Sequence, residues 1–185
     1  MCQMKRAIKG RTLGLLAASI VGALPSLAAA GDCMPSLPTG AKEVLASSYP
    51  DYRVLQLSDL NADDQGLWKN AYHDACAGVV QGAFTGVRGS YAVLLVPTKP
   101  DGGETRAVLL LPKEGGGMTQ KQIFSERRVG NLPVIRRSDP GVYEDAGKRV
   151  KVTAPSDVIL IEHLESRVTA IAFVKGEMRI LTIAD

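Results

Sequence analysis

The spacing of apolar residues changes near Gly78, and this change constrains the fold more than any other feature of the sequence. Before it, a helix from Ser58 or Asp59 to about Asp74 is expected, because apolar residues recur there at intervals of three, four and seven: Leu60, Leu67, Trp68, Ala71 and Tyr72. After it, apolar positions alternate or run together in short segments separated by turn residues. The chain therefore reads as a helical N-terminal part followed by β-structure.

The expected strands are 52–57, 78–84, 91–96, 105–111, 120–127, 132–136, 148–153, 157–161, 168–174 and 177–183. Strands 91–96 and 105–111, joined by a turn through 100–103, contain runs that are apolar on both sides, so their hairpin should be covered on both faces. A short helix is expected at 41–48, ended by Pro50. The predicted fold class is α+β, mainly an antiparallel β meander with one or two helices near the start of the mature chain.

The first 30 residues have the three-part composition of a secretory signal. A basic head without acidic residues (1–11) precedes an apolar run and then the small residues Ala28–Ala30. The run spans about 16 residues and contains Pro25, whereas a membrane-spanning helix needs roughly 20. We expect a signal peptide at 1–30 rather than a permanent anchor. The remaining 31–185 should be a single mostly β domain, periplasmic or secreted, without a membrane span.

Removal of this signal changes the charge balance. The whole chain has 22 basic and 19 acidic residues, and four of the basic ones belong to the signal. The mature part therefore has 18 against 19, a net charge of −1. Because no surplus of positive charge remains to neutralise phosphates, nucleic acid is not an expected partner.

Two cysteines remain after Cys2 leaves with the signal. Cys33 and Cys76 should pair in an oxidising compartment, joining the N-terminal segment to the end of the predicted helix, with free thiols as the alternative. Closing a loop of about 40 residues would restrict the unfolded chain by roughly 4 kcal/mol in the chain-entropy model. Lipidation of Cys33 is disfavoured, because the charged Asp32 precedes it where lipidation requires a small residue.

Residues 78–95 contain the run GVVQGAFTG followed by YAVLL. This segment resembles the strand–loop–strand unit of FG-GAP or VCBS-type propeller repeats, whose loop holds calcium through acidic or amide ligands. Here Ala83, Thr85 and Val87 stand at ligand positions, and 83–90 contains no carboxylate, although calcium takes six to eight oxygen ligands. The resemblance thus implies the backbone unit without the metal, and its glycines should serve tight turns.

The two histidines, His73 and His163, do not complete a catalytic or metal-binding motif. His73 and Cys76 give two zinc ligands at most, and the cysteine is expected in a disulfide. We expect His73 at a helix C-terminus, where a partly protonated imidazole interacts favourably with the helix dipole, and His163 in a polar turn. No G-x-S-x-G elbow accompanies Ser90. No catalytic, cofactor or metal residue is assigned.

Arg127, Arg128, Arg136 and Arg137 form the densest positive cluster. Should the two segments lie side by side, their guanidinium groups could bind a carboxylate-rich partner. The alternative is solvated charge on edge strands, which discourages aggregation.

These features favour a non-enzymatic domain that binds another protein or a cell-envelope component through a sheet face or edge loops. One version is an inhibitor or immunity protein acting on a cell-envelope lytic enzyme, an idea that rests on analogy of fold. The alternative is a small cell-envelope hydrolase using His73 or His163 with nearby carboxylates, and it predicts a histidine beside an acid in a concave pocket. A structural accessory role is the third hypothesis.

Overall fold

The computed structural model describes residues 32–73, 75–99, 103–127, 130–164 and 166–183. The predicted signal, most of the turn at 100–103, and Arg128 lie outside these residues. The helices are α1 (Thr39–Ser48) and α2 (Ala62–Tyr72), with 3-10 turns at Met34–Ser36 and Leu57–Asp59. The strands are β1 (Tyr52–Val54), β2 (Val79–Gly82), β3 (Ser90–Pro97), β4 (Glu104–Pro112), β5 (Met118–Arg127), β6 (Val134–Ser138), β7 (Gly141–Asp145), β8 (Val150–Ala154), β9 (Val158–His163), β10 (Arg167–Val174) and β11 (Glu177–Ile183).

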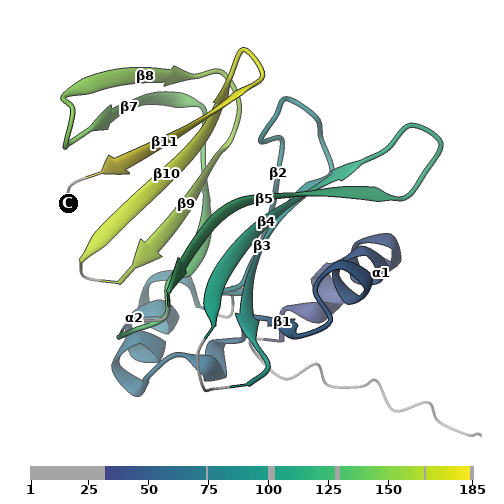
Figure 1. Ribbon diagram of the computed structural model, residues 1–185. Helices are drawn as coiled ribbons and strands as arrows, with labels where there is room; N and C mark the ends of the chain where they lie inside the picture. Colours follow the sequence, from purple (N-terminus) through teal and green to yellow (C-terminus); the bar gives the residue numbers. More distant parts are fainter. Residues whose placement is uncertain (1–31, 74, 100–102, 128–129, 165, 184–185) are drawn as a thin grey trace, which may run out of the picture.

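The strands form two main sheets and a separate ribbon (Figure 1). The first sheet has the order β1-β3-β4-β5, with β2 also paired to β3, and the second has the order β11-β10-β9-β6. Strands β7 and β8 pair with each other. Each described pairing is antiparallel, and β3-β4-β5 and β9-β10-β11 are meanders. The predicted α+β fold with an antiparallel meander is confirmed.

The β3–β4 hairpin is buried on both faces, as its apolar runs predicted. Leu94 and Leu109 belong to the core between the two sheets, whereas their neighbours Val93 and Val108 belong to a second cluster on the outer face of the first sheet. That outer face is covered by α1 and the segment before it, through Leu37, Ala41, Leu45 and Tyr49. Alternate residues of one strand thus contribute to two cores.

The outer face of the second sheet is covered by the β7–β8 ribbon. Tyr143, Val152 and Ala154 pack there against β9 and β10. Strand β7 was not predicted, because its residues Val142 and Glu144 are exposed and the segment carries no run of apolar residues. The other strands from β2 onward were predicted, with ends that differ by at most two residues.

The start of α2 corrects the sequence-based assignment. Neither Ser58 nor Asp59 caps the helix: these residues lie in a 3-10 turn, and α2 begins after Asn61, whose side chain accepts a hydrogen bond from the N–H of Asp64 (2.9 Å). The expected strand 52–57 shortens to β1 because this turn begins at Leu57. The predicted position of His73 at the C-terminus of the helix is confirmed, since it is the C-terminal cap of α2 and donates its backbone N–H to the carbonyl of Lys69.

Helix α2 closes one end of the core between the sheets (Figure 1). Trp68 is the largest fully buried side chain, and its indole N–H donates to the carbonyl of Ala75 (2.8 Å). A buried tryptophan with a satisfied N–H contributes a large apolar surface without an orphaned donor. Among the described residues, no helix has the length and apolarity required to cross a bilayer.

Candidate functional site

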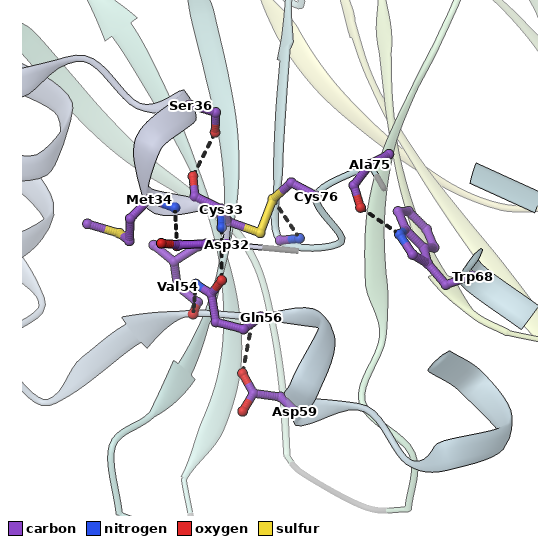
Figure 2. The surroundings of a disulfide bond; sticks show 11 residues. Asp32, Cys33, Met34, Ser36, Val54, Gln56, Asp59, Trp68, Ala75 and Cys76 are labelled. Atoms are coloured by element: carbon purple, nitrogen blue, oxygen red, sulfur yellow. Dashed lines mark hydrogen bonds between the residues drawn. A yellow bond between two sulfur atoms is a disulfide. The ribbon is translucent and has the colours of Figure 1, made fainter. Parts of the chain in front are cut away.

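The predicted disulfide between Cys33 and Cys76 is present, with the two Cα atoms 5.2 Å apart (Figure 2). It joins the segment before α1 to the segment after α2, across 43 positions of sequence. Cys33 is fully buried against the outer face of the first sheet. The bond therefore fixes the N-terminal segment, which has little regular structure of its own, to the body of the domain.

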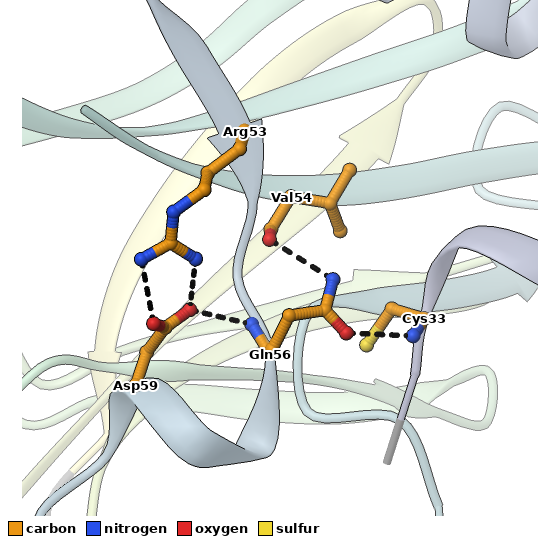
Figure 3. A network of polar contacts seen from close by, with 5 residues as sticks. All are labelled: Cys33, Arg53, Val54, Gln56 and Asp59. Atoms are coloured by element: carbon orange, nitrogen blue, oxygen red, sulfur yellow. Dashed lines mark hydrogen bonds and ion pairs between the residues drawn. The ribbon is translucent and has the colours of Figure 1, made fainter. Parts of the chain in front are cut away.

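A polar network holds the same segment a second time (Figure 3). The side chain of Gln56 accepts the N–H of Cys33 (2.8 Å) and donates to the carbonyl of Val54 (3.1 Å). Asp59 accepts the backbone N–H of Gln56 and both terminal nitrogens of Arg53, and this hydrogen bond raises the pKa of the Arg53 guanidinium. Because the Arg53 side chain is 47% exposed, the ion pair itself contributes about 1 kcal/mol at most.

These anchored segments enclose a cavity of about 470 Å³, which we call the N-terminal cavity. It lies between the N-terminal segment, α1 and β1, and its lining is mostly apolar: Asp32, Met34, Lys42, Leu45, Ala46, Tyr49, Tyr52, Arg53, Val54, Gln56 and Leu95. The rings of Tyr49 and Tyr52 meet edge to face at 6.1 Å. Its size and its apolar lining with a few polar groups are typical of ligand-binding pockets.

The polar atoms of the cavity wall are held in place. The hydroxyl of Tyr49 donates to the side-chain carbonyl of Gln120 (2.9 Å), and burial raises the pKa of this phenol, an effect that the nearby Arg106 partly offsets. The guanidinium of Arg106 lies 4.8 Å from the centre of the Tyr52 ring. These contacts fix both tyrosines before any ligand arrives.

Three lining residues at the edge of the cavity carry long or charged side chains: Asp32 and Met34 are exposed, and Lys42 is half-buried. Within the described ranges Lys42 has no ion-pair partner, and Met34 is 38% exposed at the rim. Tyrosine, methionine and arginine are the residues enriched at protein–protein interfaces. The cavity therefore combines a preformed apolar pocket with an ammonium group at its edge that no described carboxylate pairs with.

The predicted arginine cluster is divided between the two sheets. Arg136 and Arg137 lie on β6, where Arg136 pairs with Glu162 and stacks on the ring of Tyr72 at 5.0 Å. Arg137 lies 3.9 Å from a carboxylate oxygen of Asp157. Both line a smaller cavity of about 240 Å³ beside α2. Their charges are thus offset by carboxylates of the same chain.

Arg127 and Arg128 are the other half of the predicted cluster. Arg127 is exposed at the end of β5, opposite Glu104 in the β4–β5 ladder, and Arg128 lies outside the described residues. The first segment therefore belongs to one sheet and the second to the other.

His163 ends β9 and contacts an acid. Its Nε2 lies 2.6 Å from a carboxylate oxygen of Glu126, and the other oxygen of Glu126 accepts from Arg167 (3.0 Å). The Nε2–Glu126 contact is an ion pair when the imidazole is protonated, without the geometry of a directed hydrogen bond. The hydroxyl of Ser166 donates to the backbone carbonyl of His163 rather than to its ring. Neither histidine lines the N-terminal cavity or the smaller cavity beside α2.

The glycines of residues 78–90 have two different roles. Gly86 and Gly89 adopt positive φ values of 82° and 76° in the β2–β3 loop, as tight turns require. At Gly78 a β-carbon would collide with the backbone carbonyl of Leu55, and at Gly82 it would lie 2.8 Å from the Phe84 ring, so both are close approaches. Over the described part of the chain, no group of three or more His, Cys, Asp or Glu residues could hold a metal ion.

The N-terminal cavity was not predicted from the sequence. The one sequence feature that could have indicated it is the pair of tyrosines on either side of Pro50. The walls of the cavity come from three segments that meet only after folding, so no local pattern marks it. The geometry of the N-terminal cavity, rather than the fold class, therefore indicates the function. Comparisons with protein-family models, with curated proteins and with solved structures find no match to this chain.

Proposed function

We propose that this chain is a non-enzymatic periplasmic or secreted domain that binds another protein, and that the N-terminal cavity receives an apolar side chain of that partner. The observation that carries the proposal is the cavity of about 470 Å³ lined by Tyr49, Tyr52 and Met34. Buried apolar anchors that fill a pocket supply most of the free energy of typical protein interfaces.

Preorganisation supports this assignment. The disulfide and the Gln56 side chain hold Cys33, and with it the wall that carries Met34, while Gln120 holds Tyr49. Because these groups are already fixed, binding costs little ordering entropy at this surface. Each Å² of apolar surface that the partner buries contributes about 25 cal/mol before that cost.

The charges around the cavity define the partner further. Arg53 is bound to Asp59, whereas Lys42 has no ion-pair partner in the described part of the chain. Asp32, the other charged lining residue, accepts the backbone N–H of Met34 (3.0 Å), so a partner segment that places an acidic residue beside its apolar anchor would meet complementary charge at Lys42.

The biological setting follows from the predicted export signal and agrees with the disulfide. In this setting an inhibitor or immunity protein of a cell-envelope lytic enzyme is one concrete version of the proposal. The exposed Val87 and Arg88 of the β2–β3 loop are groups that such a protein could present to an enzyme.

A matched pair of substitutions on α1 tests the site. Ala46 lines the cavity mouth and Ser47, the next residue, is exposed and does not line it. Partner capture from a periplasmic extract should fall at least about tenfold with Ala46→Trp and stay unchanged with Ser47→Trp, while both variants keep the melting temperature of the wild type. Capture that is equal for both variants, or no partner captured by the wild type, would contradict the proposal.

The hydrolase alternative is favoured by one observation, the contact between His163 and Glu126. It predicts turnover of cell-wall polymers or envelope esters by the wild-type protein. Loss of that turnover in both His163→Asn and Glu126→Gln, with retained folding, would establish it. The binding proposal expects no turnover by the wild type.

A further inference from the structure

A second cavity of about 470 Å³ is lined by residues of both sheets, and we call it the inter-sheet cavity. The β2–β3 loop and the β10–β11 turn, which contribute to its walls, lie at the end of the molecule opposite α2 (Figure 1). Its walls come from the β2–β3 loop (Thr85, Gly86), the segment before β9 (Pro155, Ser156) and the β10–β11 turn. It shares no lining residue with the N-terminal cavity, so it is a separate site.

The floor of the inter-sheet cavity is part of the hydrophobic core. Leu109 and Phe173 are core residues that also line it, and Leu111 packs against the same cluster. An apolar group that enters the cavity would extend the core where it is otherwise open to solvent. The floor therefore favours a hydrocarbon or aromatic body in the ligand.

The rim of the cavity is cationic. Lys121 and Lys175 line it, and the ammonium group of Lys121 lies 5.7 Å from the centre of the Phe173 ring. Among described residues neither lysine forms an ion pair, and no carboxylate lines the cavity. Two like charges over an apolar floor attract an anion, because the low dielectric of the floor strengthens the interaction.

Two acids follow lining residues in the sequence, and neither lines the cavity: Glu177, after Gly176, pairs with Arg179 (2.6 Å). Asp157 follows Ser156, but its carboxylate accepts the N–H of Ala83 (2.8 Å) and lies 3.9 Å from Arg137. Its negative charge is therefore already engaged outside the cavity.

A buried hydroxyl lies in the wall of the cavity. The Oγ1 atom of Thr85 has almost no exposed surface, and the part of the chain that the structure describes offers it no hydrogen-bond partner. Such an orphaned group is uncommon in native proteins and is explained when a ligand or an ordered water satisfies it. Ser156, by contrast, donates its proton to the carbonyl of Phe84 (2.7 Å). A ligand oxygen would reach the Thr85 hydroxyl after a rotation of this side chain, so the two lysines, which line the rim, are the first groups that a head group meets.

We propose that the inter-sheet cavity binds an amphipathic organic anion: a hydrocarbon or aryl body that packs on Leu109 and Phe173, with a carboxylate or phosphate head that pairs with Lys121 and Lys175. This binding activity goes beyond the capture of a protein partner at the N-terminal cavity.

Titration calorimetry of the purified mature protein with four ligands of equal chain length tests the proposal. Decanoate and decyl phosphate should bind, while decanol and decyltrimethylammonium should bind at least about tenfold more weakly. A stronger response to decanoate indicates a free fatty acid as the natural source, and a stronger response to decyl phosphate indicates a phosphorylated lipid. Equal affinity for decanol and decanoate, or no binding of either anion, would overturn the proposal.

Paired lysine substitutions locate the head group. Lys121→Gln together with Lys175→Gln should weaken decanoate binding at least about tenfold. The control combines Lys113→Gln and Lys148→Gln, which remove the same charge from exposed positions outside the cavity and should leave the affinity unchanged. An equal loss in the two double variants would contradict a defined site, because it would indicate attraction by net charge alone. Capture of the protein partner should survive the Lys121/Lys175 substitution, so the two proposals can fail separately.

Discussion

The core between the two sheets ends in two different ways. At one end α2 inserts Trp68, whose indole N–H is satisfied and whose ring packs on Tyr72 at 4.4 Å, and the adjacent Arg136 is paired with Glu162. At the other end a cavity remains, and within the described residues its two lysines have no acidic partner and a buried threonine hydroxyl has no hydrogen-bond partner. The α2 end is filled by the Trp68 side chain and has the smaller cavity of about 240 Å³ beside it, whereas the other end has a cavity of about 470 Å³ whose charged and polar groups a ligand could satisfy.

The largest loss of stability is expected from removal of the Trp68 side chain, which fills the α2 end of the core. Trp68→Ala should lower the free energy of unfolding by about 3–5 kcal/mol, because it removes the largest buried side chain of the core and leaves the carbonyl of Ala75 without its donor. Urea denaturation measures this loss. A loss below about 1 kcal/mol would show that α2 is not an essential part of the core.

Removal of the disulfide should have the next largest effect, because Cys76 fixes the chain directly after α2. A variant with Cys33→Ser and Cys76→Ser should lose roughly 2–5 kcal/mol of stability in the same urea experiment. Binding of decanoate at the open end should be retained under conditions in which the variant is folded. If the ligand affinity fell together with the stability, the two ends could not be treated as independent.

Removal of one positive charge should change the stability differently at the two ends of the core. Arg136→Gln should cost about 1–2 kcal/mol, since it leaves the half-buried Glu162 without its charged partner. Lys121→Gln, at the open end, should leave the stability of the ligand-free protein unchanged or slightly raise it. Parallel denaturation curves of the two variants test this contrast, and equal losses would contradict it.

The smallest effect concerns pH. Burial raises the pKa of Tyr49 in the folded state above its unfolded value of about 10. Its contribution to stability is therefore fully present below about pH 10 and is lost as the pH rises through the folded pKa. Tyr49→Phe should flatten the decline of stability between pH 9 and 11 relative to the wild type. Identical slopes in the two proteins would show that this phenol is not shielded from solvent.

Regular patterns made much of the fold predictable from sequence. Continuous apolar runs in 91–96 and 105–111 predicted a hairpin buried on both faces, and two cysteines after a predicted export signal predicted their pairing. The predicted start of α2 was wrong. Asp59 is a good N-cap by residue type, but its carboxylate accepts hydrogen bonds from Arg53 and from the N–H of Gln56 instead. The capping propensity of a single residue does not show which of several possible donors its side chain will bind.

The inter-sheet cavity could not be predicted because its walls are distant in sequence. Thr85, Lys121 and Lys175 meet only where two loops and an edge strand approach each other across the sheets. Conversely, Arg127 and Arg136 are near in sequence and lie in different sheets. Nearness along the chain was therefore a poor guide to a binding surface, and the unpaired polar groups of the folded protein are a better one.

The contrast between the two ends of the core is tested most directly by following backbone amide NMR signals during a decanoate titration. The account predicts shifts at Thr85, Gly86, Lys175 and Gly176, with no shifts in α2. Shifts in α2, or equal shifts throughout the protein, would contradict it.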